Sequence, residues 1–402
     1  MYDFIIIGGG ISGFYCALEL LKKNKNVCIC EKYKDIGGRI STFHKEKYMW
    51  EGGAGRISTK HTMILDLLKH YKQPIVSIDS KIHYIDNCIE PNIFEDLITI
   101  YFTPFKTLHK DILATHTLRE LCIKTYGKDT TDTFLLRFPY RAEVDVLRAD
   151  LALDIFINGE MSSHEKYLVA TNGLSALIES MKNDFITKGG ILFTEYKCIH
   201  IDDFTDYITT EFLIKKTNKI FLKSKKIICA MESEALKKIN FFNSFKTLDY
   251  LKMEPLLRTY AVYDSPWFSQ YTRIVTSNPI RYFLPINYQE NIAMISYTDS
   301  SDTNKFHSIL NKYGEESLGK HIQNLLKKLF GSIPNYIFFK SHYWKYGATY
   351  WLPGKYDPYE ESQKSLKPFN SEVYVVNESF SLKQAWMEGS LEQCKKLLDI
   401  IL

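Results

Sequence analysis

A glycine-rich turn near the start of the chain has the residue types that hold the phosphates of a nucleotide. The apolar run Phe4–Ile7 leads directly into Gly8, Gly10 and Gly13, and residues 14–23 follow with apolar side chains at helical spacing. The first glycine permits a tight turn, the second lets a pyrophosphate approach the backbone, and the third lets a helix pack closely on a strand. This spacing predicts a strand, a turn and a helix.

The residues that follow the turn indicate which nucleotide it would bind. Ser12 lies where the predicted helix begins, and the unpaired N–H groups there favour anions. A second apolar strand, Val27–Cys30, ends at Glu31, 18 residues after Gly13, where an acid can bond a ribose hydroxyl. Glycine-rich turns also form for packing reasons alone, but here the strand, the helix and the acid all fit. We therefore predict a dinucleotide site.

Composition excludes several other classes of protein. At 402 residues, with 45% hydrophobic and 24% charged residues, the chain can form two structural domains with their own cores. The net charge of +4 is weak, and the densest basic run, residues 223–226, is expected to be a solvated turn before a strand. No nucleic-acid partner is expected.

Cysteine and histidine usage points to a reducing compartment and no metal. The eight cysteines are scattered, mostly in apolar segments, and neither they nor the 11 histidines show metal-ligand spacing. No apolar run approaches the roughly 20 residues that span a bilayer. We expect buried thiols, no metal site and a cytoplasmic protein, with the apolar end 397–402 forming either a last buried turn or, less favoured, a membrane contact.

Two further glycine clusters indicate that the predicted dinucleotide is a flavin. Gly37, Gly38 and Arg39 lie six to eight residues after Glu31, and Gly53-Ala54-Gly55 comes shortly after them. This arrangement resembles the flavin-containing amine oxidase superfamily, which includes monoamine, polyamine and L-amino-acid oxidases. The resemblance implies noncovalent or covalent FAD, with glycine backbone close to the cofactor and Arg39 on its pyrophosphate. A plain surface salt bridge is the alternative for Arg39.

The C-terminal segment carries the second half of the resemblance. Residues 373–378 read as a strand ending in Glu378, and Trp386-Met387-Glu388-Gly389 is similar to the superfamily's closing motif at the start of a last helix. By this resemblance Met387 opens a helix aimed at the flavin, Glu378 holds a ribityl hydroxyl or a water near the phosphates, and Trp386 forms one wall of the substrate cage. The alternative interpretations are a surface acid for Glu378 and an ordinary core tryptophan for Trp386.

The resemblance implies an α/β fold, with a Rossmann-like FAD-binding domain and a discontinuous α+β substrate-binding domain. Periodicity predicts helices over 62–72, 117–126, 130–137, 172–187 and within 309–329, and strands over 191–196, 197–201, 207–214, 220–222, 226–230, 256–263 and 292–297. The expected division assigns 1–77, 166–247 and 341–402 to the FAD domain, and 78–165 and 248–340 to the substrate domain. Cys198 falls where the family places a backbone facing the adenine.

Asn377 and Ser390 replace the family's usual glycine and alanine and are tolerable in size, whereas two other departures bear on the mechanism. Arg258 stands where many oxidases have a lysine that bonds flavin N5 through a water, and arginine cannot lose its proton; a shifted register would instead pair Arg258 with an acid. Gly347 stands near the second cage aromatic and the cysteine that some members attach to flavin. FAD is therefore expected to be noncovalent, with the cage open or completed by Tyr350 or Trp344.

Arg56 gives an indication of the substrate. It follows the Gly-Ala turn where L-amino-acid oxidases carry an arginine that clamps the substrate carboxylate. A contact with a flavin phosphate or with a carboxylate of the substrate domain is the equal alternative. The expected partners are an amine or amino-acid substrate and oxygen, and a homodimer is compatible with the resemblance.

The expected function is oxidation of an amine or amino-acid C–N bond by hydride transfer to flavin N5, giving an imine and hydrogen peroxide. Arg258, Trp386 and Arg56 are the candidate catalytic residues. Two alternatives stay open: a flavoprotein that keeps FAD as a structural or binding element without turnover, and a flavin dehydrogenase that uses another acceptor. Loose similarity in composition and pattern also links the chain to amine-oxidase-like proteins of large DNA viruses.

Overall fold

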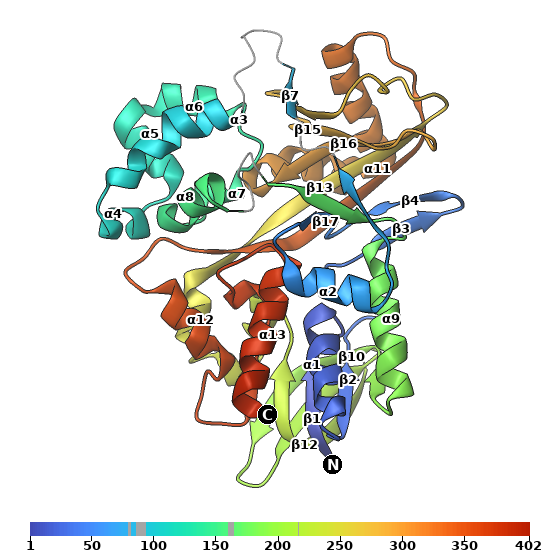
Figure 1. Cartoon of the computed structure of the whole chain (residues 1–402), viewed down its shortest axis with the longest axis vertical. Helices are drawn as coiled ribbons and strands as arrows, with labels where there is room; N and C mark the ends of the chain where they lie inside the picture. The colour runs from blue at the N-terminus through green and yellow to red at the C-terminus, as the bar shows by residue number, and fades with distance from the viewer. Residues whose placement is uncertain (79–81, 86–93, 160–164, 216) are drawn as a thin grey trace.

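A computed structural model describes residues 1–78, 82–85, 94–159, 165–215 and 217–402. Two large sheets lie one above the other, and a long pair of strands, β13 and β17, crosses between them (Figure 1). Both chain termini lie in the lower layer, at the end of the molecule farthest from the upper sheet. The α/β fold with two layers of different sheet type agrees with the expected fold class.

The lower sheet has a parallel centre flanked by an antiparallel edge. Its strands are β1 (Tyr2–Ile7), β2 (Val27–Cys30), β9 (Ile191–Phe193), β10 (Tyr196–Asp203), β11 (Ile208–Ile214), β12 (Asn218–Cys229) and β18 (Val373–Val375). The order is β10-β11-β12-β1-β2-β9, with β18 also paired to β12. Ile6 lies between Ile29 and Ile228 in register, so apolar β-branched residues form the buried centre.

Helices cover the lower sheet and fix the ends of its strands. They are α1 (Ile11–Lys22), α2 (Thr62–His70), α9 (Leu174–Thr187), α12 (Pro358–Leu366) and α13 (Met387–Ile401). Phe14 and Phe185 meet edge to face between α1 and α9, with ring centroids 6.0 Å apart. Both rings are fully buried, and Leu391 of α13 joins the same core. The predicted helix over 172–187 is confirmed, and Gly189 ends it with a φ of +88°.

The upper sheet is antiparallel except at one edge. Its strands run in the order β17 (Tyr336–Trp351), β13 (Leu251–Tyr263), β16 (Ile292–Asp299), β15 (Tyr282–Asn287), β14 (Arg273–Val275) and β7 (Ile82–Tyr84). Helix α11 (Thr303–Phe330) packs on this sheet and breaks at Gly314, whose φ is +83°. The expected helical material within 309–329 is therefore two helices that meet at a kink.

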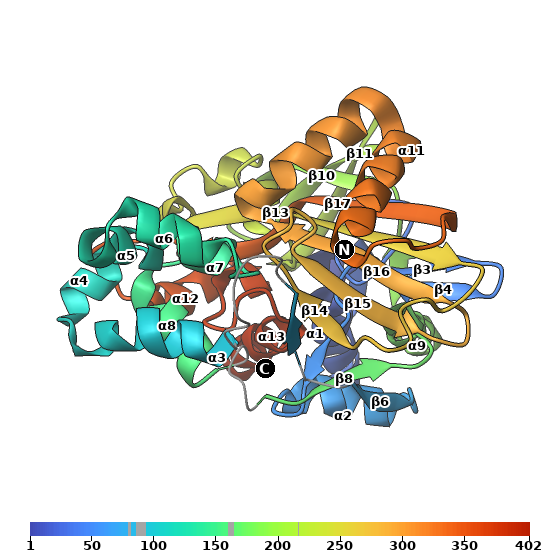
Figure 2. The ribbon, with the colours of Figure 1, turned by 90° about the horizontal axis from the view of Figure 1, so that it is seen from above.

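A group of short helices stands beside the upper sheet at one end of the molecule (Figure 2). They are α3 (Phe94–Leu97), η1 (Ile98–Phe102), η2 (Thr103–Thr107), α4 (Lys110–Thr115), α5 (Leu118–Tyr126), α6 (Lys128–Leu135), α7 (Ala142–Asp145) and α8 (Ala149–Ile157). Thr117 caps α5 through a reciprocal pair of bonds with Glu120. The helices predicted over 117–126 and 130–137 are confirmed within two residues at each end.

Smaller elements connect the two layers. The pairs are β3 (Thr42–Lys45) with β4 (Tyr48–Glu51), and β8 (Tyr167–Ala170) with both β5 (Ile57–Ser58) and β6 (Ile75–Ile78). The remaining short helices are α10 (Ser233–Leu236), η3 (Asn240–Phe242), η4 (Lys246–Tyr250), η5 (Ser300–Asp302) and η6 (Glu378–Phe380). Strand β5 begins two residues after the Gly53-Ala54-Gly55 turn and pairs with β8.

Two local expectations were wrong. The two strands predicted over 220–222 and 226–230 form one continuous strand, β12, because its first half pairs with β11 and its second half with β1 and β18. The basic run 223–226 therefore lies inside a strand and is not a turn. Lys225 pairs with Asp3 at 2.9 Å, and Lys226 pairs with Glu372 at 3.0 Å.

The expectation for cysteines holds in the described residues, and that for the C-terminus holds in part. Seven cysteines are free and buried; Cys88 lies outside the described residues. Leu397 and Leu398 are buried at the end of α13, whereas Ile400 and Leu402 are 60% and 52% exposed, so the apolar end is buried on one side only. Within the described ranges, every helix is too short or too polar to cross a bilayer.

Candidate active site

The glycine turn joins β1 to α1 by close backbone packing. Gly8 has a φ of +118°, and a Cβ on Gly13 would lie 2.0 Å from the Gly8 carbonyl oxygen, so strand and helix pack backbone to backbone. A Cβ on Gly10 would meet no atom nearer than 3.7 Å. Helix α1 begins at Gly10 without a side-chain cap or an acid in its first turn, and Ser12 is buried within that turn. The open backbone donors there suit a phosphate.

The acid predicted to bind ribose lies against this turn. Glu31 is 6% exposed, and its Oε2 accepts a 2.7 Å hydrogen bond from the Gly9 N–H. Tyr196 of β10 donates its N–H to the Glu31 carbonyl at 2.8 Å, which brings the neighbouring Cys198 to the same edge of the sheet. Gly38 has a φ of +61°, and a Cβ on it would lie 4.0 Å from the Gly10 Cα. The structure thus brings these predicted residues together.

Arg39 joins the two ends of the chain. Its Nη1 contacts Glu378 Oε1 at 2.7 Å and the Gly347 carbonyl at 3.3 Å, and its Nη2 donates to Asn377 Oδ1 at 3.2 Å. Glu378 is 5% exposed at its side chain and also accepts a 3.3 Å bond from the Thr349 N–H. Arg39 thus forms a salt bridge, but a largely buried one and not the surface pair of the alternative, and Glu378 is not a surface acid.

The Gly53-Ala54-Gly55 turn packs against Arg39 and Arg258. The Ala54 N–H donates to the Arg39 carbonyl at 2.9 Å, and Arg258 Nη1 donates to the Gly53 carbonyl. Arg258 forms no ion pair with any carboxylate in the described ranges, and its buried Nε has no partner there. The alternative in which Arg258 simply pairs with an acid is therefore not observed.

The start of α13 lies beside this turn and beside α2. Trp386 is the residue before the helix, and Met387, which is buried, opens it without a side-chain cap. Glu388 accepts hydrogen bonds from the Met63 and Ile64 N–H groups at 2.9 and 3.0 Å, so it caps α2. The sequence reasoning missed this role of Glu388, because the acid lies 325 positions from the Met63 N–H that it accepts.

An aromatic and basic cluster surrounds Trp386. The Trp386 ring stacks on Tyr167 with centroids 6.2 Å apart and planes 7° apart, and His61 meets its edge at 4.9 Å. Two guanidinium groups lie over the Tyr167 ring, Arg56 at 5.0 Å and Arg273 at 5.8 Å. The interpretation of Trp386 as an ordinary core residue does not fit its partial exposure in this cluster.

Arg56 is placed at this cluster without a direct ion pair in the described ranges, although its charge acts on the nearby Glu143 carboxyl group. Its Nη1 lies 3.5 Å from the Tyr140 hydroxyl, and none of the acids in the described ranges forms an ion pair with it. Sequence reasoning missed Tyr167, Arg273 and His61, because they come from strands and turns whose proximity has no local sequence signal. The cluster can receive an anionic group between its two arginines.

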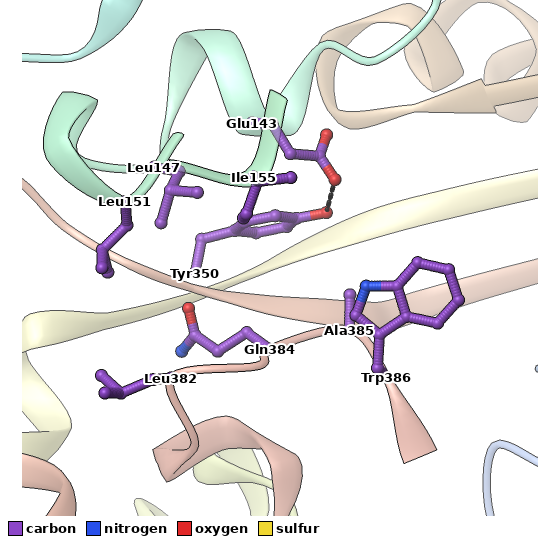
Figure 3. A pocket seen from close by; sticks show the side chains of 9 residues that line it. All are labelled: Glu143, Leu147, Leu151, Ile155, Tyr350, Leu382, Gln384, Ala385 and Trp386. Carbon is purple, nitrogen blue, oxygen red and sulfur yellow. Dashed lines mark hydrogen bonds between the residues drawn. The ribbon is translucent and has the colours of Figure 1, made fainter. Parts of the chain in front are cut away.

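A small cavity opens next to the cluster (Figure 3). It lies between α8 and the loop before α13, and Glu143, Tyr350 and Trp386 contribute its polar and aromatic walls. The Tyr350 hydroxyl donates to Glu143 Oε1 at 3.2 Å. Burial raises the pKa of Glu143 to about 7. Sequence reasoning did not single out Glu143, since a lone acid in a helical segment is more often exposed.

His342 of β17 lies opposite Arg258 of β13 and is uncharged at neutral pH. Trp50 Nε1 donates to His342 Nε2 at 3.0 Å, and burial with the nearby Lys340 and Arg258 lowers the pKa of His342 to about 4. Its acceptor nitrogen stays available to Trp50 at neutral pH. No cluster of three metal-binding side chains occurs among the described residues.

Comparison with known proteins agrees with the two-layer organisation. Residues 6–71 match the NAD(P)-binding Rossmann-like domain, and residues 92–396 match the flavin containing amine oxidoreductase family. An uncharacterized protein of Acanthamoeba polyphaga mimivirus is 23% identical over 98% of this chain and 93% of its own length. An L-amino-acid oxidase of Sistrurus catenatus edwardsii is 31% identical, but over only 17% of this chain and 13% of its own.

Solved structures show the same fold at low identity. A putrescine oxidase bound to putrescine superposes with a TM-score of 0.77 and 14% identity, covering 100% of this chain and 99% of that one. Cyclohexylamine oxidase from Brevibacterium oxydans gives 0.77 and 16%, covering 99% and 98%. Since the family match spans most of the chain, this protein belongs to the flavin containing amine oxidoreductases and is a flavin-dependent amine oxidase by class.

Proposed function

We propose that the chain binds FAD noncovalently across the lower sheet and oxidises the C–N bond of an amine or amino acid. The residues at the glycine turn suit the cofactor: a Cβ on Gly10 or Gly38 would meet backbone at 3.7 or 4.0 Å, so neither glycine carries a side chain that would block a phosphate, and the uncapped start of α1 would supply donors. Residues 1–77, 166–247 and 341–402 would form the FAD domain, and 78–165 and 248–340 the substrate domain. Gly347 leaves no thiol at the position of covalent attachment.

The residues around the glycine turn would hold FAD along its length. Glu31 would exchange its bond to the Gly9 N–H for a ribose hydroxyl, with Cys198 offering backbone to the adenine. Arg39 would hold the pyrophosphate and Glu378 a nearby hydroxyl or water. The Gly53-Ala54-Gly55 turn and the start of α13 at Met387 would border the flavin ring.

Bound FAD would supply the oxidising power, taking a hydride equivalent from the carbon next to nitrogen and passing the electrons to oxygen, which gives hydrogen peroxide. The resulting imine hydrolyses in water. The protein's contribution is position and electrostatics: Trp386 and Tyr167 form an aromatic wall, and Arg258 fixes the Gly53 carbonyl beside it.

Arg56 favours a substrate that carries a carboxylate. Its guanidinium stacks on Tyr167 next to Trp386, in reach of the cage, and it forms no ion pair with a described acid. A buried or partly buried cation without a counterion is costly, so an anionic group of the substrate would stabilise it. A contact with a flavin phosphate is the alternative that the experiment below separates.

The observation that carries the proposal is the meeting of both chain ends at one place, through the bond between Arg39 and Glu378. The test is an anaerobic spectral titration of the FAD-loaded protein with a panel of monoamines, polyamines and amino acids. We expect at least one class to bleach the flavin. If none does, the proposal loses its support, whereas reduction by amino acids alone would assign Arg56 to the carboxylate.

One observation favours a second candidate, turnover with an acceptor other than oxygen. Arg258 replaces a lysine and cannot give up a proton. A dehydrogenase would be reduced by its substrate and reoxidised faster by an artificial acceptor than by oxygen. A flavoprotein without turnover would bind FAD, resist reduction, and gain no peroxide production in Arg258→Lys. Comparing oxygen with the artificial acceptor in both proteins separates the three cases.

A further inference from the structure

Glu143 is a buried carboxyl group with half of its hydrogen-bonding capacity unused. It lies on α7, is 4% exposed, and accepts the Tyr350 hydroxyl on Oε1 at 3.2 Å. Its Oε2 is buried and has no partner in the described part of the chain. A carboxylate oxygen left in this state costs stability unless a ligand satisfies it. Figure 3 shows the carboxyl group at the wall of the cavity that Trp386 also lines.

The cavity is suited to a small cationic head group. Its volume is about 10 Å³, which is room for one group the size of a water or an ammonium. Its remaining walls are mostly apolar, with Leu147 from just before α8 and Leu151 and Ile155 from α8 (Figure 3). A water alone would find few polar partners among these aliphatic side chains, whereas an ammonium would match the carboxylate, with its alkyl chain extending outside the cavity.

The charges around Glu143 decide its protonation. Burial opposes the ionised form, whereas the backbone N–H of Glu143 itself, the Tyr350 hydroxyl and the charge of Arg56 favour it. Asp299 of β16 is also buried; burial, and next the charge of Glu143, raise its pKa well above the usual range, and Tyr297 and Tyr140 face the same group of residues. Two buried acids at close range do not both ionise readily. Asp299 therefore keeps its proton when Glu143 loses one.

We propose that Glu143 receives the protonated amino group of the substrate on its free Oε2 and takes the proton that the amine must lose before its C–N bond is oxidised. This inference rests on the proposed function and assigns a catalytic residue to it. The step breaks one N–H bond and forms one O–H bond, leaving a neutral amine and a neutral acid, and no electrons are transferred.

Burial makes this transfer feasible. An amine in water holds its proton more tightly than a carboxylate does. In an apolar cavity, however, the ammonium and carboxylate both lose their hydration, and proton transfer removes both charges at once. The apolar walls from α8 thus assist the transfer, and Tyr350 holds the carboxylate in place through Oε1.

The test uses the FAD-loaded protein without oxygen and hexylamine as the probe. Binding is read from the perturbation of the oxidised flavin spectrum, and oxidation from the rate of flavin bleaching. For the wild type we expect the dissociation constant to be constant from pH 7.5 to 9, and to rise about tenfold per pH unit below pH 7 as Glu143 gains a proton.

Glu143→Gln should weaken hexylamine binding roughly tenfold to 150-fold at pH 8, the loss typical of a hydrogen bond to a charged group, and the pH dependence below 7 should vanish. Its bleaching rate should fall most at neutral pH and approach the wild-type rate near pH 10, where neutral amine is abundant. Equal binding by both proteins, or a rate ratio that is constant with pH, would overturn the proposal.

A second variant keeps the test decisive if Glu143→Gln folds poorly. Tyr350→Phe removes only the hydroxyl that stabilises the ionised carboxylate. The rise of the hexylamine dissociation constant at low pH should therefore begin at a higher pH than in the wild type. If it begins at the same pH, the result counts against the proposal. Glu315→Gln is the matched control, because Glu315 binds Ser341 and Lys340 away from the cavity. If hexylamine binds with this pH profile but never bleaches the flavin, the site stands and the proposed oxidation fails for this amine.

Discussion

The bond between Arg39 and Glu378 gives the sharpest prediction about what holds the cofactor domain together. It joins residues 339 positions apart. Replacing Arg39 with methionine keeps most of the side-chain volume and removes the charge. Glu378, 5% exposed at its side chain, would keep only longer bonds of 3.3 and 3.4 Å from Thr349 and one of 3.0 Å from Ser379. A buried carboxylate would then lack its counterion.

The expected loss follows from that uncompensated charge. Breaking a buried pair by removing one partner costs about 3–5 kcal/mol. Since the Arg39 side chain is 26% exposed, we expect the lower end, about 3 kcal/mol. A chain of 402 residues that unfolds as one unit has an unfolding entropy of about 0.8 kcal/mol per kelvin, so the melting temperature should fall by roughly 3–4 °C.

The assay is thermal and denaturant unfolding of the FAD-free protein, so that cofactor affinity does not enter. The double variant Arg39→Met with Glu378→Gln should regain most of the loss, because no charge is left unpaired. Lys320→Met, which removes an exposed pair with Glu316, is the control and should leave stability unchanged. A loss below about 1 kcal/mol for Arg39→Met, or a double variant as unstable as the single one, would refute the reasoning.

Three further outcomes are expected. Glu143→Gln should stabilise the protein by up to about 3 kcal/mol at pH 8 and by little at pH 4, since the folded-state pKa of about 7 makes the charged form costly above pH 7; equal unfolding curves at pH 8 would contradict this. The folded-state pKa of His342 is about 4, so the free energy of unfolding of the wild type should fall by about 2 kcal/mol from pH 7 to pH 5, as pH drops below the unfolded-state value of 6.5. Urea titrations of His342→Asn should not show this fall. Gly13→Ala should cost about 1–3 kcal/mol and lower the flavin retained on dialysis, because its Cβ would lie 2.0 Å from the Gly8 oxygen; full retention would speak against the close packing.

Local patterns were sufficient for the parts of the fold that local physics determines. The glycine turn at Gly8 to Gly13, the helix ending before Gly189, and the acid at Glu31 each have a steric or hydrogen-bonding requirement that the sequence displays directly. The placement of Arg39 and Glu378 near one another followed from the resemblance at the two chain ends, and their direct bond was not predicted.

The features that sequence reasoning missed depend on long-range pairing or burial. Strand β12 appeared as two strands because polar residues interrupt its middle, yet it changes partners there and continues. Tyr167 and Arg273 meet Trp386 and Arg56 only through the packing of β8 and β14. The burial of Glu143 follows from α8 and β17 closing over it, which no residue spacing in α7 reveals.

The central claim, that this protein oxidises amines with FAD and oxygen, is tested most directly by stoichiometry. The FAD-loaded protein is mixed with one equivalent of a substrate that bleaches it under anaerobic conditions, and oxygen is then admitted. The account predicts one hydrogen peroxide and one carbonyl product from imine hydrolysis for each amine consumed, with the oxidised flavin spectrum fully restored. A bleached flavin that stays reduced in oxygen, or reoxidises without a product of C–N oxidation, would contradict it.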